Sequence, residues 1–381
     1  MNRWILTALV WLLAASVVQA DNRVGDTERH MLRAFGPWPM TLQPDAGNEL
    51  SGLPWAEQLG EVLFRSTYFS GDGSRSCASC HEAALGFTDG LAVAVGAGVH
   101  VRNTQGLLDV GLQRWFGWDG GADSLWAASL RPMLSDIELN GNIESIASRL
   151  RMQTDVMQRL ERAGQPLDDD ESLIVLAAKA IAAYMRTLQS RATAFDAFRS
   201  AVLEKGEGEA IDSYPADARR GLSIFLGEGN CHVCHYGPNF SNQEFHDTGR
   251  PFFTGIGQVD PGRYEGIKRV RTDRYNLISR YNGTRQKREI QKTRTVTLGQ
   301  VNFGQWRTPS LRNLLFTAPY MHDGSLATLR DVVDAYADVD PDRIHSDGEA
   351  IIRPLDLDDR DRDDLVAFLS SLSPTEPGIE D

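Results

Sequence analysis

Two stretches of the chain repeat the same spacing of apolar and small residues. Residues 59–64 and 220–225 are each predicted to form an amphipathic helix with a glycine and a phenylalanine four positions apart on one face. Each half of the chain later carries an apolar helix, expected over residues 178–188 and 363–372. Strand patterns are sparse, so the sequence predicts a mostly α-helical protein.

The repeated glycines indicate how these helices pack. Gly60 and Gly221 have no side chain, which allows each helix to cross the last helix of its own half closely, with Tyr184 or Phe368 at the contact. Helices are also expected over residues 142–150 and 170–188, the second with Asp170 as its N-cap.

Composition matters chiefly through the cysteines. The chain has 381 residues, 41% hydrophobic and 24% charged, which excludes a disordered or disulfide-dense protein. Its four cysteines form two C-x-x-C-H motifs: Cys77, Cys80 and His81, and Cys231, Cys234 and His235. Two thiols at this spacing reach the vinyl groups of a porphyrin, and the adjacent histidine becomes the proximal iron ligand. A redox-active C-x-x-C does not need that histidine, and zinc needs further ligands. The motifs therefore predict two covalently bound c-type haems.

Helix, haem motif and closing helix occur twice in the same order. This is the arrangement of a class I cytochrome c fold, so the sequence predicts two such domains in tandem. We expect them to span residues 21–206 and 207–381, with the boundary in a polar, glycine-containing linker.

The first 20 residues have the features of a secretory leader. Arg3 precedes an apolar run, and a small-residue cleavage site ends at Ala20. The run of about 15 residues is short for a membrane span, so we expect export to the periplasm, cleavage and no stable membrane insertion. The net charge of −13 disfavours nucleic acid as a partner. A basic stretch at residues 263–294 is a solvated loop, a docking surface for an acidic redox partner or a lid over haem propionates.

Short segments outside the haem motifs are also distinctive. They are F-T-D-G-L-A-V (87–93), R-N-T (102–104), F-G-W-D-G (116–120), F-H-D-T-G (245–249), R-T-P-S-L-R-N (307–313) and T-A-P-Y-M-H-D-G-S (317–325). With these segments the chain resembles the bacterial di-haem cytochrome c peroxidase and MauG superfamily from about residue 60 to residue 372. The resemblance implies two cytochrome c domains with a calcium ion and a tryptophan between the haems.

The resemblance assigns residues to that central region. Trp118 matches the tryptophan that relays electrons between the irons; the alternative is a core tryptophan beside Phe116. Asn103, Thr317 and Pro319 match the calcium site, which uses one amide oxygen and two backbone carbonyls. Calcium accepts such neutral oxygens.

The first haem is the expected peroxide site. Pro132 and Glu138 match the proline and glutamate over its open face, and Glu138 is the expected catalytic acid–base. The alternative is an exposed loop glutamate with Asp136 as an equally titratable neighbour. The family often has glutamine four residues before the proline, whereas this chain has Ala128.

The distal ligands indicate the branch of the family. Ala97 stands where other members carry a ligating histidine, so the first iron is expected to be open, with His100 as an alternative sixth ligand. At the second haem Tyr336 matches the tyrosine of MauG-like enzymes, and phenolate ligation lowers the iron potential. The alternative is a core tyrosine with Met321 as the ligand.

We therefore expect an exported di-haem peroxidase of the MauG-like branch. Hydrogen peroxide would be reduced at the His81 haem with Glu138, Pro132 and Trp118 as catalytic residues. Electrons would come from a small redox protein (a cytochrome c or cupredoxin) or from oxidisable aromatic residues of a protein substrate; Tyr336 and Ala97 favour the second. The alternative is an electron-transfer cytochrome without substrate chemistry of its own.

Overall fold

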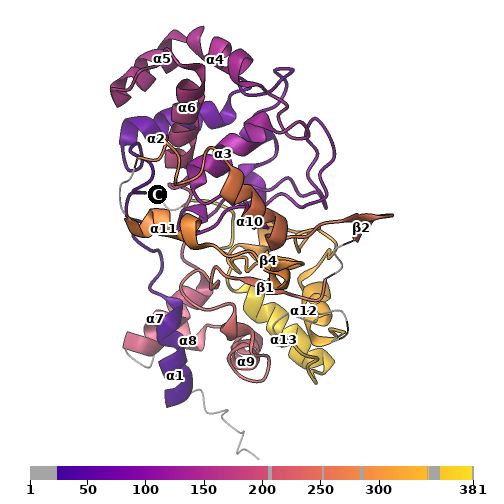
Figure 1. The fold of residues 1–381 in the computed structure, drawn as a ribbon. Coiled ribbons are helices and arrows are strands. Elements are labelled where there is room, and N and C mark those ends of the chain that lie inside the picture. The colour runs from indigo at the N-terminus through magenta and orange to yellow at the C-terminus, as the bar shows by residue number, and fades with distance from the viewer. Residues whose placement is uncertain are drawn as a thin grey trace, which may run out of the picture.

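The computed structural model describes residues 24–204, 208–250, 253–283, 287–340, 342 and 352–379 (Figure 1). The expected leader (1–20) and the expected domain boundary at 206/207 lie outside these residues. The helices are α1 (Asp26–Leu32), α2 (Pro54–Arg65), α3 (Leu125–Leu134), α4 (Ile143–Arg151), α5 (Thr154–Leu160), α6 (Asp170–Met185), α7 (Ala194–Glu204), α8 (Glu209–Asp212), α9 (Ala216–Leu226), α10 (Arg263–Thr272), α11 (Lys287–Thr295), α12 (Leu329–Ala337) and α13 (Asp359–Ser370).

Strands are short and few in the described part of the chain, which confirms the mostly helical prediction. Strand β1 (Phe245–Asp247) pairs antiparallel with β4 (Gln305–Arg307), and His246 lies opposite Trp306. Strands β2 (Phe253–Gly255) and β3 (Gln258–Val259) form a hairpin that projects from the body (Figure 1). No helix within the described ranges is both long and apolar enough to cross a membrane.

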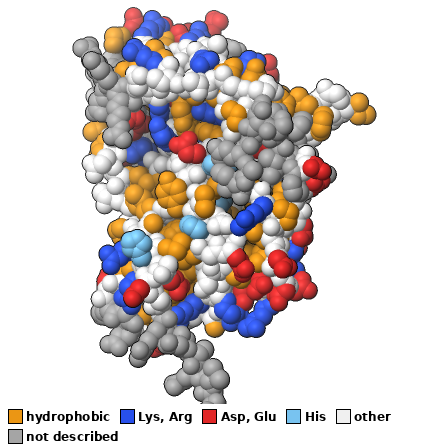
Figure 2. All heavy atoms as spheres, turned by 60° about the horizontal axis from the view of Figure 1, so that its bottom comes forward, with side chains coloured by type: hydrophobic (Ala, Val, Ile, Leu, Met, Phe, Trp, Pro, Cys, Tyr) orange, Lys and Arg blue, Asp and Glu red, His pale blue; other side chains and the backbone are white. Residues whose placement is uncertain are grey.

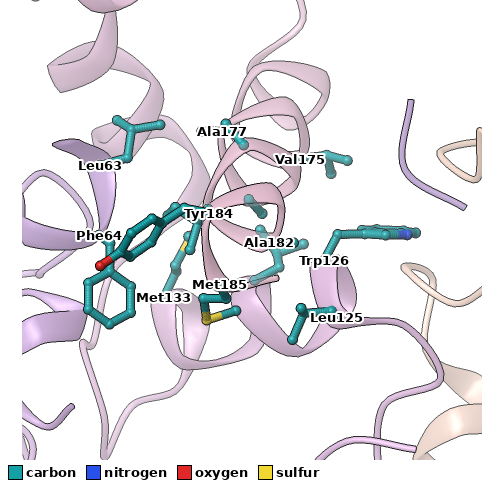
Figure 3. Close-up of a cluster of buried hydrophobic side chains, with 14 of the residues drawn as sticks. Leu63, Phe64, Leu125, Trp126, Met133, Val175, Ala177, Ala182, Tyr184 and Met185 are labelled. Carbon is teal, nitrogen blue, oxygen red and sulfur yellow. The ribbon is translucent and has the colours of Figure 1, made fainter. Parts of the chain in front are cut away.

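The upper half of the molecule in Figure 1 is built around α6. Every residue of this helix from Leu173 to Met185 is buried, because α2, α3 and α4 surround it. Phe64 of α2 and Tyr184 of α6 face each other with ring centroids 5.4 Å apart (Figure 3). This cluster carries the first C-x-x-C-H motif on its edge, since Cys77 packs against it.

The predicted glycine crossings are present in both halves. A Cβ atom placed on Gly60 would lie 2.0 Å from the Ala180 carbonyl oxygen of α6, and one on Gly221 would lie 1.9 Å from the Asp364 carbonyl oxygen of α13. Neither site has room for a side chain, so glycine is what lets each helix pair approach backbone to backbone.

The lower half contains a second buried cluster, formed by α7, α9, α12, α13 and the start of the described chain. Leu32 of α1 and the nearby Phe35 are buried in it, beside Phe195 of α7 and Phe368 of α13. From residue 24 onward the chain thus starts in the lower cluster, builds the upper cluster from α2 to α6, and returns through α7 (Figure 1).

Helix starts depart slightly from the sequence prediction. The N-cap of α6 is Asp169 rather than Asp170: its extended backbone lets its carboxylate accept from the Ser172 amide at 3.0 Å. Likewise α13 begins at Asp359, before the expected residue 363, because Asp358 and Asp361 form a capping box.

The basic stretch packs against the body of the protein at some positions, although Lys268, Arg271, Arg274, Arg280 and Arg294 are exposed. Arg263 is buried, with its guanidinium 3.8 Å from the Phe245 ring centroid and 4.5 Å from that of Trp115. Arg274 pairs with Glu171 at 2.9 Å, at the start of α6. Helices α10 and α11 therefore form a strap between the two halves, rather than a fully solvated loop (Figure 1).

Candidate functional site: two cavities joined by a tryptophan

The first C-x-x-C-H motif forms a short turn at the edge of a cavity of about 230 Å³. Residues Cys77–Ser79 form a 3₁₀ turn, and the His81 amide donates to the Cys77 carbonyl at 3.0 Å. Both cysteines and His81 line the cavity. The His81 Nδ1 lies 2.8 Å from the Phe87 carbonyl oxygen, which can only accept a hydrogen bond. The Nδ1 nitrogen is thus the donor, which leaves Nε2 available to an iron.

The second motif repeats this arrangement at a cavity of about 290 Å³. Cys231–Val233 forms the turn, the cysteines and His235 line the cavity, and the His235 Nδ1 lies 2.9 Å from the Phe240 carbonyl oxygen. Phe87 and Phe240 both have left-handed backbones, with φ of 62° and 48°. Sequence reasoning missed this role of the two phenylalanines; the signal was an aromatic residue five or six positions after each motif histidine.

The thiols suit attachment to a haem better than redox exchange. None of the four cysteines, all of which lie in the described part of the chain, forms a disulfide, and burial raises the pKa of Cys77 and Cys231 to about 12. A thioredoxin-like pair depends on a lowered thiol pKa. A thiol pair and an oriented imidazole at the wall of an apolar cavity are what a c-type haem requires, so the residues present fit that cofactor in both halves.

Glu138 and Pro132 line the first cavity together with His81. The alternative carboxylate, Asp136, is exposed and is not among the lining residues. The loop that contains Ala97 holds the backbone of Glu138 in place: the Ala97 amide donates to the Glu138 carbonyl at 2.8 Å. Ala128 also lines this cavity, so the position where the family often has glutamine does face it.

Tyr336 and Met321, the two alternative ligands, both line the second cavity. On α12 the residues Leu329, Val333 and Ala337 point into the lower cluster, whereas Tyr336 lies outside it. Burial raises the pKa of the Tyr336 phenol, so a phenolate here would need an adjacent positive charge. Tyr336 thus faces the second cavity and is not a member of the lower cluster, and Met321 lines the same cavity.

Ion pairs fix the helix that carries Tyr336. Arg330 and Arg362 join α12 to α13 through carboxylates 2.7–2.9 Å away: Asp334, Asp338, Asp359 and Asp363. Figure 2 shows acidic and basic side chains interspersed over this region, at the lower right. Single exposed pairs contribute little, but a network of this kind restricts how α12 can shift.

Trp118 lies between the cavities and lines both of them. Its Nε1 donates to the Asn103 carbonyl at 2.9 Å, and Asn103 also lines both cavities. Phe116 belongs to the upper cluster while Trp118 does not, which argues against a purely core role. The other two expected calcium ligands, Thr317 and Pro319, line the second cavity. The Asn103 Nδ2 donates to the Leu91 carbonyl at 2.9 Å, so its amide oxygen stays available as a ligand.

A buried cluster of charged side chains lies next to the segment that carries Trp118. Arg102 lies 2.7 Å from Asp119 and 2.6 Å from Asp260, and so ties the segment next to Trp118 to the second half of the chain. Arg269 of the strap also reaches Asp119, at 3.0 Å. Burial alone would raise the pKa of Asp119, but the guanidinium groups of Arg102, Arg131 and Arg269 outweigh it and hold the pKa well below its ordinary value.

Known proteins are similar to this chain along nearly its whole length. A family model described as di-haem cytochrome c peroxidase matches residues 54–202. Cytochrome-c peroxidase IdrP1 of Denitromonas iodatirespirans is 33% identical, over 98% of this chain and 94% of that protein. Methylamine utilization protein MauG of Methylorubrum extorquens is 32% identical, over 82% and 77%.

Solved structures give the same fold. A MauG-like protein associated with microbial copper homeostasis superposes with a TM-score of 0.67 at 24% identity, covering 89% of this chain and 96% of that one. The di-haem peroxidase BthA from Burkholderia thailandensis gives 0.68 at 20% identity, covering 90% of each chain. The family model and the relatives show that the chain belongs to the di-haem cytochrome c peroxidase and MauG family of oxidoreductases.

Proposed function

We propose that the protein is an exported, periplasmic di-haem peroxidase of the MauG-like branch, built as two tandem cytochrome c domains. It reduces hydrogen peroxide at the haem held by His81 and draws electrons through the haem held by His235. One observation carries the proposal: Trp118 lines both cavities, and Glu138 lines only the first. A chain that only transferred electrons would need the tryptophan but no carboxyl group at an open iron.

Cys77, Cys80 and His81 would hold a haem in the first cavity, and that haem would supply the redox chemistry toward peroxide. The protein supplies the protons. Reduction of peroxide to two waters consumes two electrons and two protons, and a proton must leave the inner oxygen and reach the outer one. Glu138 performs that transfer as acid–base, and Pro132 shapes the cavity beside it. The backbone bond from Ala97 keeps the carboxyl group within reach.

Ligation and structural metal complete the site. Tyr336 would supply a phenol oxygen to a haem iron held in the second cavity, whereas Ala97 offers no ligand at the first. A calcium ion held by Asn103, Thr317 and Pro319 would brace the segment that carries the Trp118 hydrogen bond.

The electron source is an aromatic side chain of a partner protein, as the MauG-like features Tyr336 and Ala97 favour. The second candidate is a small redox protein, a cytochrome c or a cupredoxin, and the name of the cytochrome-c peroxidase relatives supports the cytochrome.

The direct test adds hydrogen peroxide to the diferric protein and follows both haems by optical and electron paramagnetic resonance spectroscopy. Spectral change at both haems from peroxide added at the first is the expected result. In Trp118→Phe the second haem should respond far more slowly while the first still reacts. If hydrogen peroxide changes the spectrum of neither haem, the protein is an electron-transfer cytochrome and not a peroxidase.

Replacing Tyr336 by methionine should raise the reduction potential of the second haem by on the order of 0.1 V, within the ~0.8 V range that axial ligands span. A thioether stabilises ferrous iron, whereas a phenolate oxygen stabilises ferric iron. Spectroelectrochemical titration of each haem measures the shift. Met321→Leu is the matched control, because Met321 lines the same cavity. If only that control shifts the potential and Tyr336→Phe leaves the spectrum unchanged, the tyrosine assignment is wrong.

A further inference from the structure

The loop before Arg102 brings a histidine into the first cavity beside Glu138. His100 is half-buried and lines the cavity with Glu138 and Arg131. Its Nε2 lies 3.9 Å from Glu138 Oε1, and the Arg131 guanidinium approaches the same oxygen, also at 3.9 Å. A histidine in this position has two uses: as the sixth ligand of the iron, or as a partner of the carboxyl group.

The other ring nitrogen of His100 distinguishes these uses. The Arg102 backbone amide donates to the His100 Nδ1 at 3.0 Å. A backbone amide has a proton and no lone pair to offer, so Nδ1 is the acceptor and the neutral ring carries its proton on Nε2. A protonated Nε2 has no lone pair for iron. Ligation through Nε2 would move the proton to Nδ1 and set it against the Arg102 N–H.

The two motif histidines provide an internal comparison. His81 and His235 each present Nδ1 to a backbone carbonyl, which fixes the proton on Nδ1 and frees Nε2 for the metal. His100 shows the opposite arrangement, with Nδ1 facing a donor. Backbone hydrogen bonds therefore leave Nε2 of His81 and His235 unprotonated for iron, and they leave the proton of His100 on Nε2.

We infer that His100 is a positioning residue for Glu138 and not the sixth ligand of the first haem. As a neutral ring it directs its Nε2 proton toward Glu138 Oε1, on the side that Arg131 also approaches, and leaves the second carboxyl oxygen to exchange a proton with peroxide. The separation of 3.9 Å is longer than a hydrogen bond, and such contacts commonly tighten when substrate binds. The inference rests on the proposed function, because it takes Glu138 as the acid–base.

The charges around His100 favour the neutral form. Burial is the largest effect and lowers the pKa of His100. Arg102 and Arg131 lower it as well, whereas Glu138 and Asp260 raise it. The resulting pKa lies below the ordinary value of histidine. At pH 7 the ring is therefore uncharged. In acid the ring gains a proton on Nδ1, loses its bond from the Arg102 amide and can no longer hold the same position.

The test compares His100→Leu and His100→Gln with wild type, in haem-loaded diferric protein. The exposed His30 on α1 supplies a matched control, His30→Gln. The ferric spectrum of the first haem should be the same in all four proteins, since no ligand is lost. The rate of the peroxide-induced spectral change at pH 7 should fall about tenfold in His100→Leu, the effect of one hydrogen bond to a charged group. The wild-type rate should fall as the pH drops and His100 gains its second proton. His100→Gln keeps a donor that does not titrate, so it should retain most of the rate at pH 7 and should not show this fall in acid.

A double-variant comparison shows whether His100 acts through Glu138. In a Glu138→Gln background, His100→Leu should cost nothing further; an additive loss would mean that the two residues act separately and would overturn the inference. A change of spin state at the first haem in His100→Gln would identify His100 as a ligand and would also overturn it. Failure of the proposed function looks different: a wild-type protein that does not react with peroxide, whatever the ferric spectra of the His100 variants.

Discussion

Replacing Glu138 by glutamine is expected to slow the reaction of the diferric protein with hydrogen peroxide by about 100-fold or more, the usual contribution of a positioned acid–base. Glutamine has nearly the same size and still fills the space beside Pro132, but it cannot take up and release a proton. Peroxide should still reach the iron. Stopped-flow spectroscopy of the first haem, at several peroxide concentrations, measures the rate of the reaction separately from binding.

The matched control is Asp136→Asn, which removes the neighbouring carboxyl group without touching the cavity. Asp136 is exposed and lies outside the lining of the first cavity. Its variant should react at the wild-type rate, and both variants should keep the wild-type ferric spectrum. Rapid reaction of Glu138→Gln alongside that unchanged spectrum would remove Glu138 from the mechanism.

Features set by local spacing were predictable from the sequence. The haem motifs are contained within five residues each. The glycine crossings need only one small residue on a helix face, so the helical pattern around Gly60 and Gly221 was enough to assign them. Of the two carboxylates that the sequence offered in this loop, Glu138 lines the first cavity and the exposed Asp136 does not.

Features that depend on pairs of residues far apart in the chain could not be predicted. The bond between Arg102 and Asp260 spans 158 residues and leaves no periodic pattern. The burial of Arg263 beneath two aromatic rings reverses the ordinary expectation for an arginine in a basic run, and depends on where Trp115 and Phe245 meet. The donor at His100 Nδ1 is a backbone amide, whose direction is set by the loop and not by residue type.

Replacing Arg102 by methionine is expected to destabilise the fold by about 3–5 kcal/mol at pH 7, the usual cost of leaving a buried charge without its partner. Methionine keeps much of the volume but none of the charge. It would leave Asp119, which is fully buried, and Asp260, which is 5% exposed, without their shortest ion pairs. Urea unfolding of the wild type and the variant, followed by circular dichroism, measures the difference.

The loss should depend on pH in a definite direction. In the wild type the pKa of Asp119 is held below its unfolded value, so its contribution to stability is present above about pH 4, the unfolded pKa, and is lost as the pH falls further. In the variant, burial is opposed by Arg131, Arg269 and the Gly121 amide without Arg102, so the pKa of Asp119 rises and protonation in acid relieves the penalty. The gap between the two proteins should thus be widest at neutral pH and should narrow as the pH drops toward 4. Arg65→Met removes an exposed pair with Glu61 and should cost less than about 1 kcal/mol at any pH. Equal losses in the two variants would mean that the Arg102 cluster does not hold the two halves together around Trp118.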